Sequence, residues 1–220
     1  YAYHIKAGKE IFAAEGAFGQ YLICFRDFPV AIGITAGARE YLAADICLKY
    51  MKEAISEPCN EEQLEAAEKA LRAKLNSLSL VQPEGTFRTA RKEAAKLFDR
   101  KILFTENPRK VESVVFTKEG YRIKIEAVIN GEQKTLYASY KAWKRNNLYP
   151  DDFTKKYQSV AYAMDAEALY LSVGLINTSY KEEYSLWVNS EDKVIATWRP
   201  NVTYLPEEPD MVWKFTGTFE

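Results

Sequence analysis

The spacing of apolar residues changes near residue 110 of this 220-residue chain. Before that point apolar residues recur at every third or fourth position, as on one face of a helix, and after it they recur at every second position, as in a strand. Helices followed by strands predict an α+β protein and argue against alternating βαβ units. We therefore expect a helical region over residues 1–109 and an antiparallel β-sheet region over residues 110–220, joined by a shared core into one cooperative unit.

The first half is predicted to form a bundle of about four helices, because the apolar residues have a helical period in the stretches 9–28, 37–56, 60–78 and 86–103. Asn60 lies three residues before Gln63, which is the spacing of a capping box at the start of a helix. The break at residues 56–59 predicts that the second and third helices form an antiparallel αα-hairpin. Cys59 lies in that break and Cys47 in the helix before it, so either a disulfide or two free thiols would fit.

The first predicted helix and the segment after it are rich in glycine. A glycine inside a helix costs about 1 kcal/mol relative to alanine, and close packing against a neighbour is the usual compensation. That neighbour is either another part of this chain or a docked protein or membrane edge, and a simple loop over residues 29–37 is a further interpretation. The residues predicted for a protein interface are Phe12, Phe18 and Tyr21.

A second candidate interface is a basic stripe on the helix predicted over residues 86–103. Its members, Arg88, Lys92, Lys96 and Arg100, are spaced four residues apart and so share one helix face. The stripe is either solvated or paired within the chain, or it binds a partner. Because the net charge of the chain is only −1, an acidic protein surface is favoured over nucleic acid as that partner.

The second half is predicted to form about eight antiparallel strands, arranged as a meander or a half-barrel. The clearest pair is the hairpin over residues 121–143, where Asn130-Gly131 is the preferred type I′ turn. A two-residue loop places Ile125 opposite Leu136 and Ile123 opposite Ala138, so apolar residues meet on one face. The other predicted strands cover residues 111–116, 159–164, 168–176, 184–188, 194–199 and 213–219.

Catalytic chemistry finds little support in the sequence. The only histidine is His4, whereas histidine is the commonest general base and metal ligand. Neither a metal-binding cluster nor a phosphate loop is present, so no cofactor, metal or catalytic residue is predicted. Acidic doublets such as Glu182-Glu183 leave a carboxylate hydrolase as a second alternative, but neighbours on a strand point to opposite faces.

These observations favour a non-catalytic accessory or structural subunit that acts through protein–protein interaction in a larger assembly. The alternative is a binding protein for a small apolar or aromatic ligand, because all four tryptophans lie in the sheet half and aromatic side chains can line a pocket. The predicted pocket residues are Trp187, Trp198 and Trp213. The same aromatic residues could instead form the core between helices and sheet.

Localisation is left open by the sequence. No stretch is long and apolar enough to span a bilayer, although peripheral contact with a membrane is compatible with the glycine-rich segment. The sequence starts at Tyr1 rather than methionine, which fits either a processed secreted or organellar protein or a shortened sequence.

Overall fold

The computed structural model describes residues 4–7, 9–38, 43–56, 60–87, 92–153, 156–202 and 211–220. The chain divides into two units, Tyr1–Val81 and Gln82–Glu220. Residues 82–109, expected with the helical region, therefore belong to the second unit. The shared core and the single cooperative unit stay predictions from the sequence.

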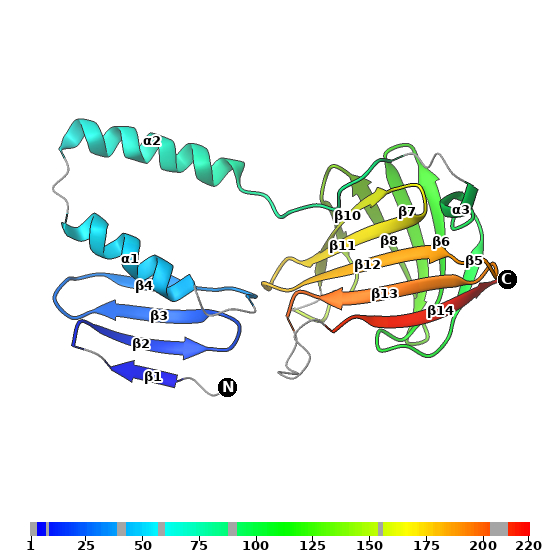
Figure 1. Cartoon of the computed structure of the whole chain (residues 1–220), viewed down its shortest axis with the longest axis horizontal. Helices are drawn as coiled ribbons and strands as arrows, with labels where there is room; N and C mark the ends of the chain where they lie inside the picture. The colour runs from blue at the N-terminus through cyan, green and yellow to red at the C-terminus, as the bar shows by residue number, and fades with distance from the viewer. Residues whose placement is uncertain are drawn as a thin grey trace. The chain divides into compact units, whose positions relative to one another are not determined.

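The first unit begins with a four-stranded antiparallel sheet in chain order (Figure 1). Its strands are β1 (His4–Ala7), β2 (Ile11–Gly16), β3 (Gln20–Phe25) and β4 (Ala31–Ile34). The helix expected over residues 9–28 is wrong. Positive φ angles at Phe18 (62°) and Gly19 (85°) reverse the chain there, so the glycines serve a turn instead of helix packing.

One face of this sheet is covered and the other is open. Tyr21, Ile23 and Phe25 are buried at every second position of β3, and Leu48 and Met51 from helix α1 (Ala43–Ser56) pack against that core. On the opposite face Phe12 is 42% exposed and Leu22 is 53% exposed. Alternation along the strands therefore leaves an apolar surface that α1 does not cover.

Helix α2 (Glu61–Ser77) forms where the sequence predicts it. The Asn60 side chain accepts a hydrogen bond from the Gln63 amide at 2.9 Å, and the Gln63 side chain accepts one from the Asn60 amide at 3.1 Å, which completes the capping box. However, α2 has no buried residue, and its leucines Leu64, Leu71, Leu75 and Leu78 are exposed. The packing expected of an αα-hairpin is therefore not supported. Residues 57–59 and the Cys47 side chain lie outside the described part, so the predicted choice between disulfide and thiols does too.

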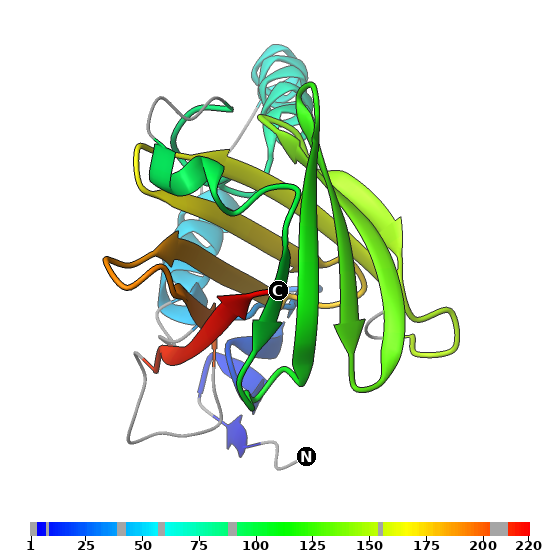
Figure 2. The ribbon, with the colours of Figure 1, turned by 90° about the vertical axis from the view of Figure 1, so that its right-hand side faces the viewer.

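The second unit is a ten-stranded sheet that closes into a barrel. β10 pairs with β11 in an antiparallel ladder and with β8 in a parallel one, and β14 pairs with β5, so the ring is complete. Figure 2 shows β5–β8 and β11–β14 as opposite walls of this barrel. The strands are β5 (Lys101–Phe104), β6 (Val111–Glu119), β7 (Arg122–Ile129), β8 (Glu132–Tyr140), β9 (Lys144–Asn147), β10 (Tyr157–Met164), β11 (Ala168–Leu175), β12 (Lys181–Val188), β13 (Val194–Pro200) and β14 (Trp213–Phe219).

The helical bundle packed on a meander or half-barrel is therefore wrong as a fold class. The helix expected over residues 86–103 is reduced to α3 (Lys92–Ala95), because Asp99 has a positive φ of 58° and its amide donates to the Phe116 carbonyl at 2.8 Å. The apolar pattern that suggested a helix is a short turn followed by β5. In the described part of the chain, no helix is long and apolar enough to cross a membrane.

The hairpin predicted over residues 121–143 is confirmed as β7 and β8. Ile125 lies opposite Leu136 and Ile123 opposite Ala138. Asn130 and Gly131 have φ values of 52° and 76°, as a type I′ turn requires. Here local sequence alone was sufficient.

A side chain completes the junction between β8 and β9. The Asn146 Oδ1 atom accepts a hydrogen bond from the Tyr137 amide at 2.7 Å, and its Nδ2 atom donates to the Tyr137 carbonyl at 2.9 Å. The buried amide thus takes the place of a backbone ladder at this point. The sequence treated residues 146–157 as a loop and missed β9.

The segment before α3 is joined to the end of β10. The amides and carbonyls of Thr86 and Met164 exchange hydrogen bonds of 2.7 and 2.8 Å, and the Tyr140 hydroxyl donates to the Gly85 carbonyl at 2.9 Å. Gly85 has a φ of 140°, and a Cβ atom there would lie 2.4 Å from the Met164 carbonyl oxygen. Only glycine allows this close approach.

Candidate functional site

A cavity of about 390 Å³ lies inside the barrel. Alternation along the strands aims every second side chain at this interior, and most of these side chains are apolar. The apolar wall consists of Val114, Phe116, Ile125, Ala127, Leu136, Leu148, Val160, Leu171, Val173, Leu186, Ala196 and Phe215.

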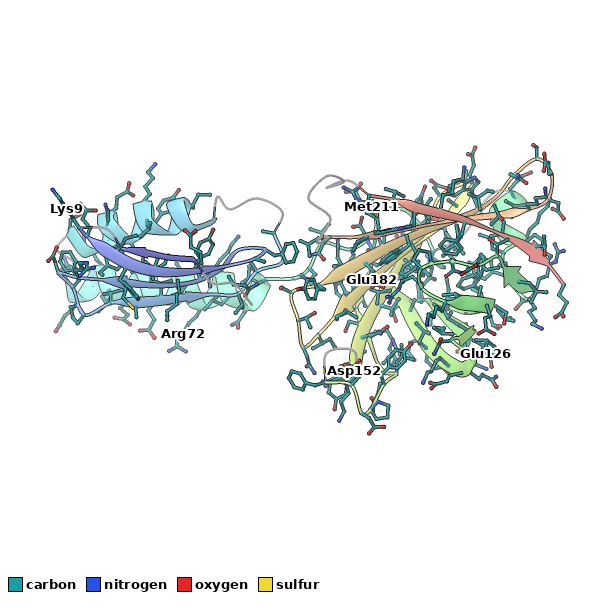
Figure 3. The ribbon with its side chains drawn as sticks, turned by 90° about the horizontal axis from the view of Figure 1, so that it is seen from below. Lys9, Arg72, Glu126, Asp152, Glu182 and Met211 are labelled. Carbon is teal, nitrogen blue, oxygen red and sulfur yellow. The ribbon has the colours of Figure 1, made fainter. Side chains whose placement is uncertain are left out.

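Three polar side chains form a hydrogen-bonded cluster in this wall. Arg109, on the loop after β5, lies 3.0 Å from a Glu182 carboxylate oxygen through its guanidinium NH2 group, and its Nε donates to the Tyr184 hydroxyl at 3.3 Å. The Tyr184 hydroxyl donates to the other Glu182 oxygen at 2.7 Å. Glu182 and Tyr184 are two residues apart on β12, so both face inward; Figure 3 labels Glu182 among the side chains of the barrel.

Burial governs the electrostatics of this cluster. Burial, reinforced by the negative charge of Glu182, raises the pKa of Tyr184 far above its ordinary value, so its hydroxyl keeps its proton and donates it to Glu182. Burial opposes the charge of Arg109, but attraction to Tyr184 and Glu182 outweighs it and raises the Arg109 pKa. The cluster therefore holds one positive and one negative charge.

Aromatic rings flank the guanidinium. The Arg109 guanidinium carbon lies 5.2 Å from the centre of the Trp198 ring, within the range of a cation–π interaction. Trp198 in turn stacks on Trp213, with ring centres 4.3 Å apart. The Trp198 indole nitrogen is buried and has no hydrogen-bond partner within the described ranges.

Gln158 is a further polar group of the cavity wall. It is only 7% exposed and lines the cavity from β10. The hydrogen bonds of this residue involve its backbone, so in the described part of the chain its side-chain amide has no partner. A buried amide with unused donors and acceptors can bind a polar group of a guest molecule.

The three predicted pocket tryptophans do not act as one group. Trp198 and Trp213 stack beside Arg109, whereas Trp187 lies on the opposite face of β12 from Leu186, with Lys214 Nζ 5.9 Å from its ring centre. Among the described cavity-lining residues none is a tryptophan. Their role in ligand binding stays a prediction.

Sequence reasoning missed Arg109, Glu182 and Gln158. The strand was expected to begin at Tyr184, but β12 begins at Lys181, so Glu182 was assigned to an acidic doublet. The usable signal was the alternation of Glu182, Tyr184 and Leu186, which places an acidic group on the buried face of a strand. Nothing in the local sequence pointed to Arg109.

The predicted interface residues are also separated. Phe12 is exposed on the open face of the first sheet, Tyr21 is buried on the covered face, and Phe18 is half-buried in the turn between β2 and β3. A role for them in protein binding stays a prediction.

The basic stripe does not form a helix face. Lys96 Nζ lies 2.8 Å from an Asp192 oxygen, and the Arg100 guanidinium carbon lies 3.7 Å from the centre of the Phe219 ring. Arg88 and the side chain of Lys92 lie outside the described residues. The two described members thus have partners within the barrel, as one of the two predicted alternatives holds.

A metal site is not found in the described part of the chain, where no three histidine, cysteine or acidic side chains are placed to hold an ion. No family model matches the sequence, and no curated protein matches it. Two solved structures are similar to this chain. One is the REP1-NXSQ fatty acid transporter, at 13% identity over 58% of this chain and 98% of that one, with a TM-score of 0.42. The other is a fatty-acid-binding protein isolated from Manduca sexta, at 10% identity over 56% and 98%, with a TM-score of 0.41.

Proposed function

We propose that the barrel of residues 82–220 binds a small, largely apolar molecule in its interior. The observation that carries this proposal is the cavity of about 390 Å³ with apolar walls on all the main strands. Ligand sites in proteins typically have volumes of about 300–1,000 Å³, apolar linings and a few placed polar groups. The barrel has each of these properties.

The wall and the polar cluster have different roles in this proposal. Apolar surface removed from water stabilises a complex by roughly 25 cal/mol per Å², so the wall supplies affinity. Arg109, Glu182 and Tyr184 hold one another in place, and the uncommitted amide of Gln158 offers hydrogen bonds. These groups would set the orientation of the ligand within the cavity.

The proposal is tested by filling the cavity. Ala127 lines it from β7, whereas Glu126, its neighbour on the same strand, points to the outer face. With an uncharged dye such as Nile red as the probe, Ala127→Phe is expected to weaken binding about tenfold or more, and Glu126→Phe to leave it within about twofold. Equal binding by both variants, or no binding by the unaltered protein, would overturn the proposal.

A second candidate function is protein binding by residues 1–81. It is supported by the uncovered apolar face at Phe12 and Leu22 and by the exposed leucines of α2, since exposed apolar patches commonly mark interaction sites. Its test is native mass spectrometry of the chain purified gently from its source. Reproducible co-purifying subunits that are lost on Leu22→Ser would support it, and a lone chain would overturn it.

A further inference from the structure

We infer that the polar end of the ligand is uncharged, as in an alcohol, amide or carbonyl group, and is not a carboxylate. This inference rests on the proposed ligand-binding function and names the class of molecule that the cavity accepts. Three observations support it: the charge balance of the cavity, the commitments of Arg109 and the free amide of Gln158.

The described charged residues that line the cavity balance one another. Arg109 and Lys110 are positive, and Asp152 and Glu182 are negative. Moving a further negative charge from water into this interior would leave it without a counter-charge, which is strongly unfavourable in a medium of low dielectric constant. An uncharged ligand avoids that penalty.

Arg109 is the obvious group to receive a carboxylate, and it is already engaged. Its guanidinium is paired with Glu182 at 3.0 Å and with the Tyr184 hydroxyl at 3.3 Å. Two parallel hydrogen bonds to a ligand carboxylate would compete with Glu182, which is 7% exposed and would be left buried without its ion pair. The guanidinium can still donate a single remaining N–H to an uncharged oxygen.

Gln158 provides the complementary group. Its amide both donates and accepts, which matches an alcohol or amide, whereas a carboxylate only accepts. Val160, the next inward residue on β10, lies opposite Val173, and Val173 lies opposite Glu182. Gln158 is therefore on the same inner wall as the Arg109–Glu182 pair, on the order of 10 Å away across two strand spacings, and can be reached without disturbing that pair.

The experiment compares three ligands with the same unbranched alkyl chain: a carboxylic acid, the primary alcohol and the primary amide. Each displaces Nile red from the full chain at pH 8, where the acid is ionised. We expect the alcohol and amide to bind about tenfold more tightly than the acid. Equal or tighter binding of the acid would overturn the inference while leaving the proposed function intact. Binding by none of the three would overturn both.

Two variants sharpen the test. Glu182→Gln keeps the shape of the side chain but removes its charge, so the acid should gain about tenfold relative to the alcohol. Gln158→Leu should weaken the alcohol and amide about tenfold relative to the acid, because it removes the hydrogen-bonding amide. An unchanged ranking in both folded variants would overturn the inference. If either variant fails to fold, as judged by circular dichroism, the ranking in the unaltered protein decides.

Discussion

The first unit covers one face of a sheet with a helix, whereas the second closes a sheet around its own interior. In residues 1–81 the small core contains Ala13, Tyr21, Ile23 and Phe25, with α1 packed against it, and Phe12 and Leu22 stay exposed behind it. In residues 82–220 the paired ends of the sheet remove its free edges and enclose a cavity. A closed sheet makes a binding volume, and a half-covered sheet leaves a surface.

Core truncation in each unit is the largest expected effect. Ile123 in the barrel is fully buried and Ile23 in the first sheet is 1% exposed. Replacing either by alanine should cost about 4 kcal/mol, which is a larger share of the stability of the unit with the smaller core.

The measurement uses a natural reporter, because all four tryptophans lie in the barrel. Tryptophan fluorescence in urea should show a large loss of stability for Ile123→Ala. For Ile23→Ala, hydrogen exchange of residues 11–34 should rise while the fluorescence transition stays in place. A transition that moves for Ile23→Ala would instead support the single cooperative unit predicted from the sequence.

The next largest effect tests how closely the barrel packs at its N-terminal segment. Gly85→Ala should destabilise the barrel by about 3 kcal/mol, because the new methyl group would overlap the Met164 carbonyl and the φ angle of 140° is strained for alanine. Gly120→Ala is the matched control: its φ is also positive, at 61°, but nothing lies within 4 Å, so about 1 kcal/mol is expected. Equal losses in urea denaturation would show that the contact with Met164 is unimportant.

A smaller effect of opposite sign is expected at Tyr162. Its hydroxyl is buried without a hydrogen-bond partner in the described residues, so Tyr162→Phe should stabilise the barrel by about 1 kcal/mol at neutral pH. Tyr170→Phe is the control, because the Tyr170 hydroxyl donates to Asp165 at 2.6 Å and its loss should not stabilise. A destabilised Tyr162→Phe variant would mean that this hydroxyl has a favourable contact.

Tyr162 also gives the barrel a pH dependence. Burial, with a smaller contribution from Tyr140, raises the pKa of Tyr162 to about 12, above the value of about 10 in the unfolded chain. The folded state then holds the proton more tightly, so its contribution is complete below about pH 10 and is lost as the pH rises towards 12. Urea titrations across this window should show a shallower fall for Tyr162→Phe, and an identical fall would contradict the assignment.

The smallest effect on stability is expected on α2. Leu71 is exposed, so Leu71→Ser should change the free energy of unfolding by no more than about 0.5 kcal/mol. If α2 binds a partner, the same change should weaken that association in native mass spectrometry. Ser77→Ala, on the same helix, is the control. A large loss of stability in the isolated chain would show that Leu71 is packed.

Patterns that act over a few residues were read correctly from the sequence. The capping box at Asn60, the type I′ turn at Asn130-Gly131 and the register of β7 against β8 each depend on neighbours in the chain. The helix over residues 9–28 failed because Ile11, Leu22 and Phe25 fit both a helical period and two strands, and local spacing does not choose between them. The turn at Phe18 and Gly19 decided it.

The sequence by itself determined the two long helices, most strands of the second half and the strength of its central hairpin, because these depend on alternation, capping and turn chemistry between near neighbours. Only the tertiary structure decided that the sheet closes, since the parallel pairing of β8 with β10 and the pairing of β14 with β5 join distant segments. The candidate site has the same origin. Arg109 and Tyr184 are 75 residues apart in the chain, and only the curvature of the closed sheet brings them to one wall of a cavity.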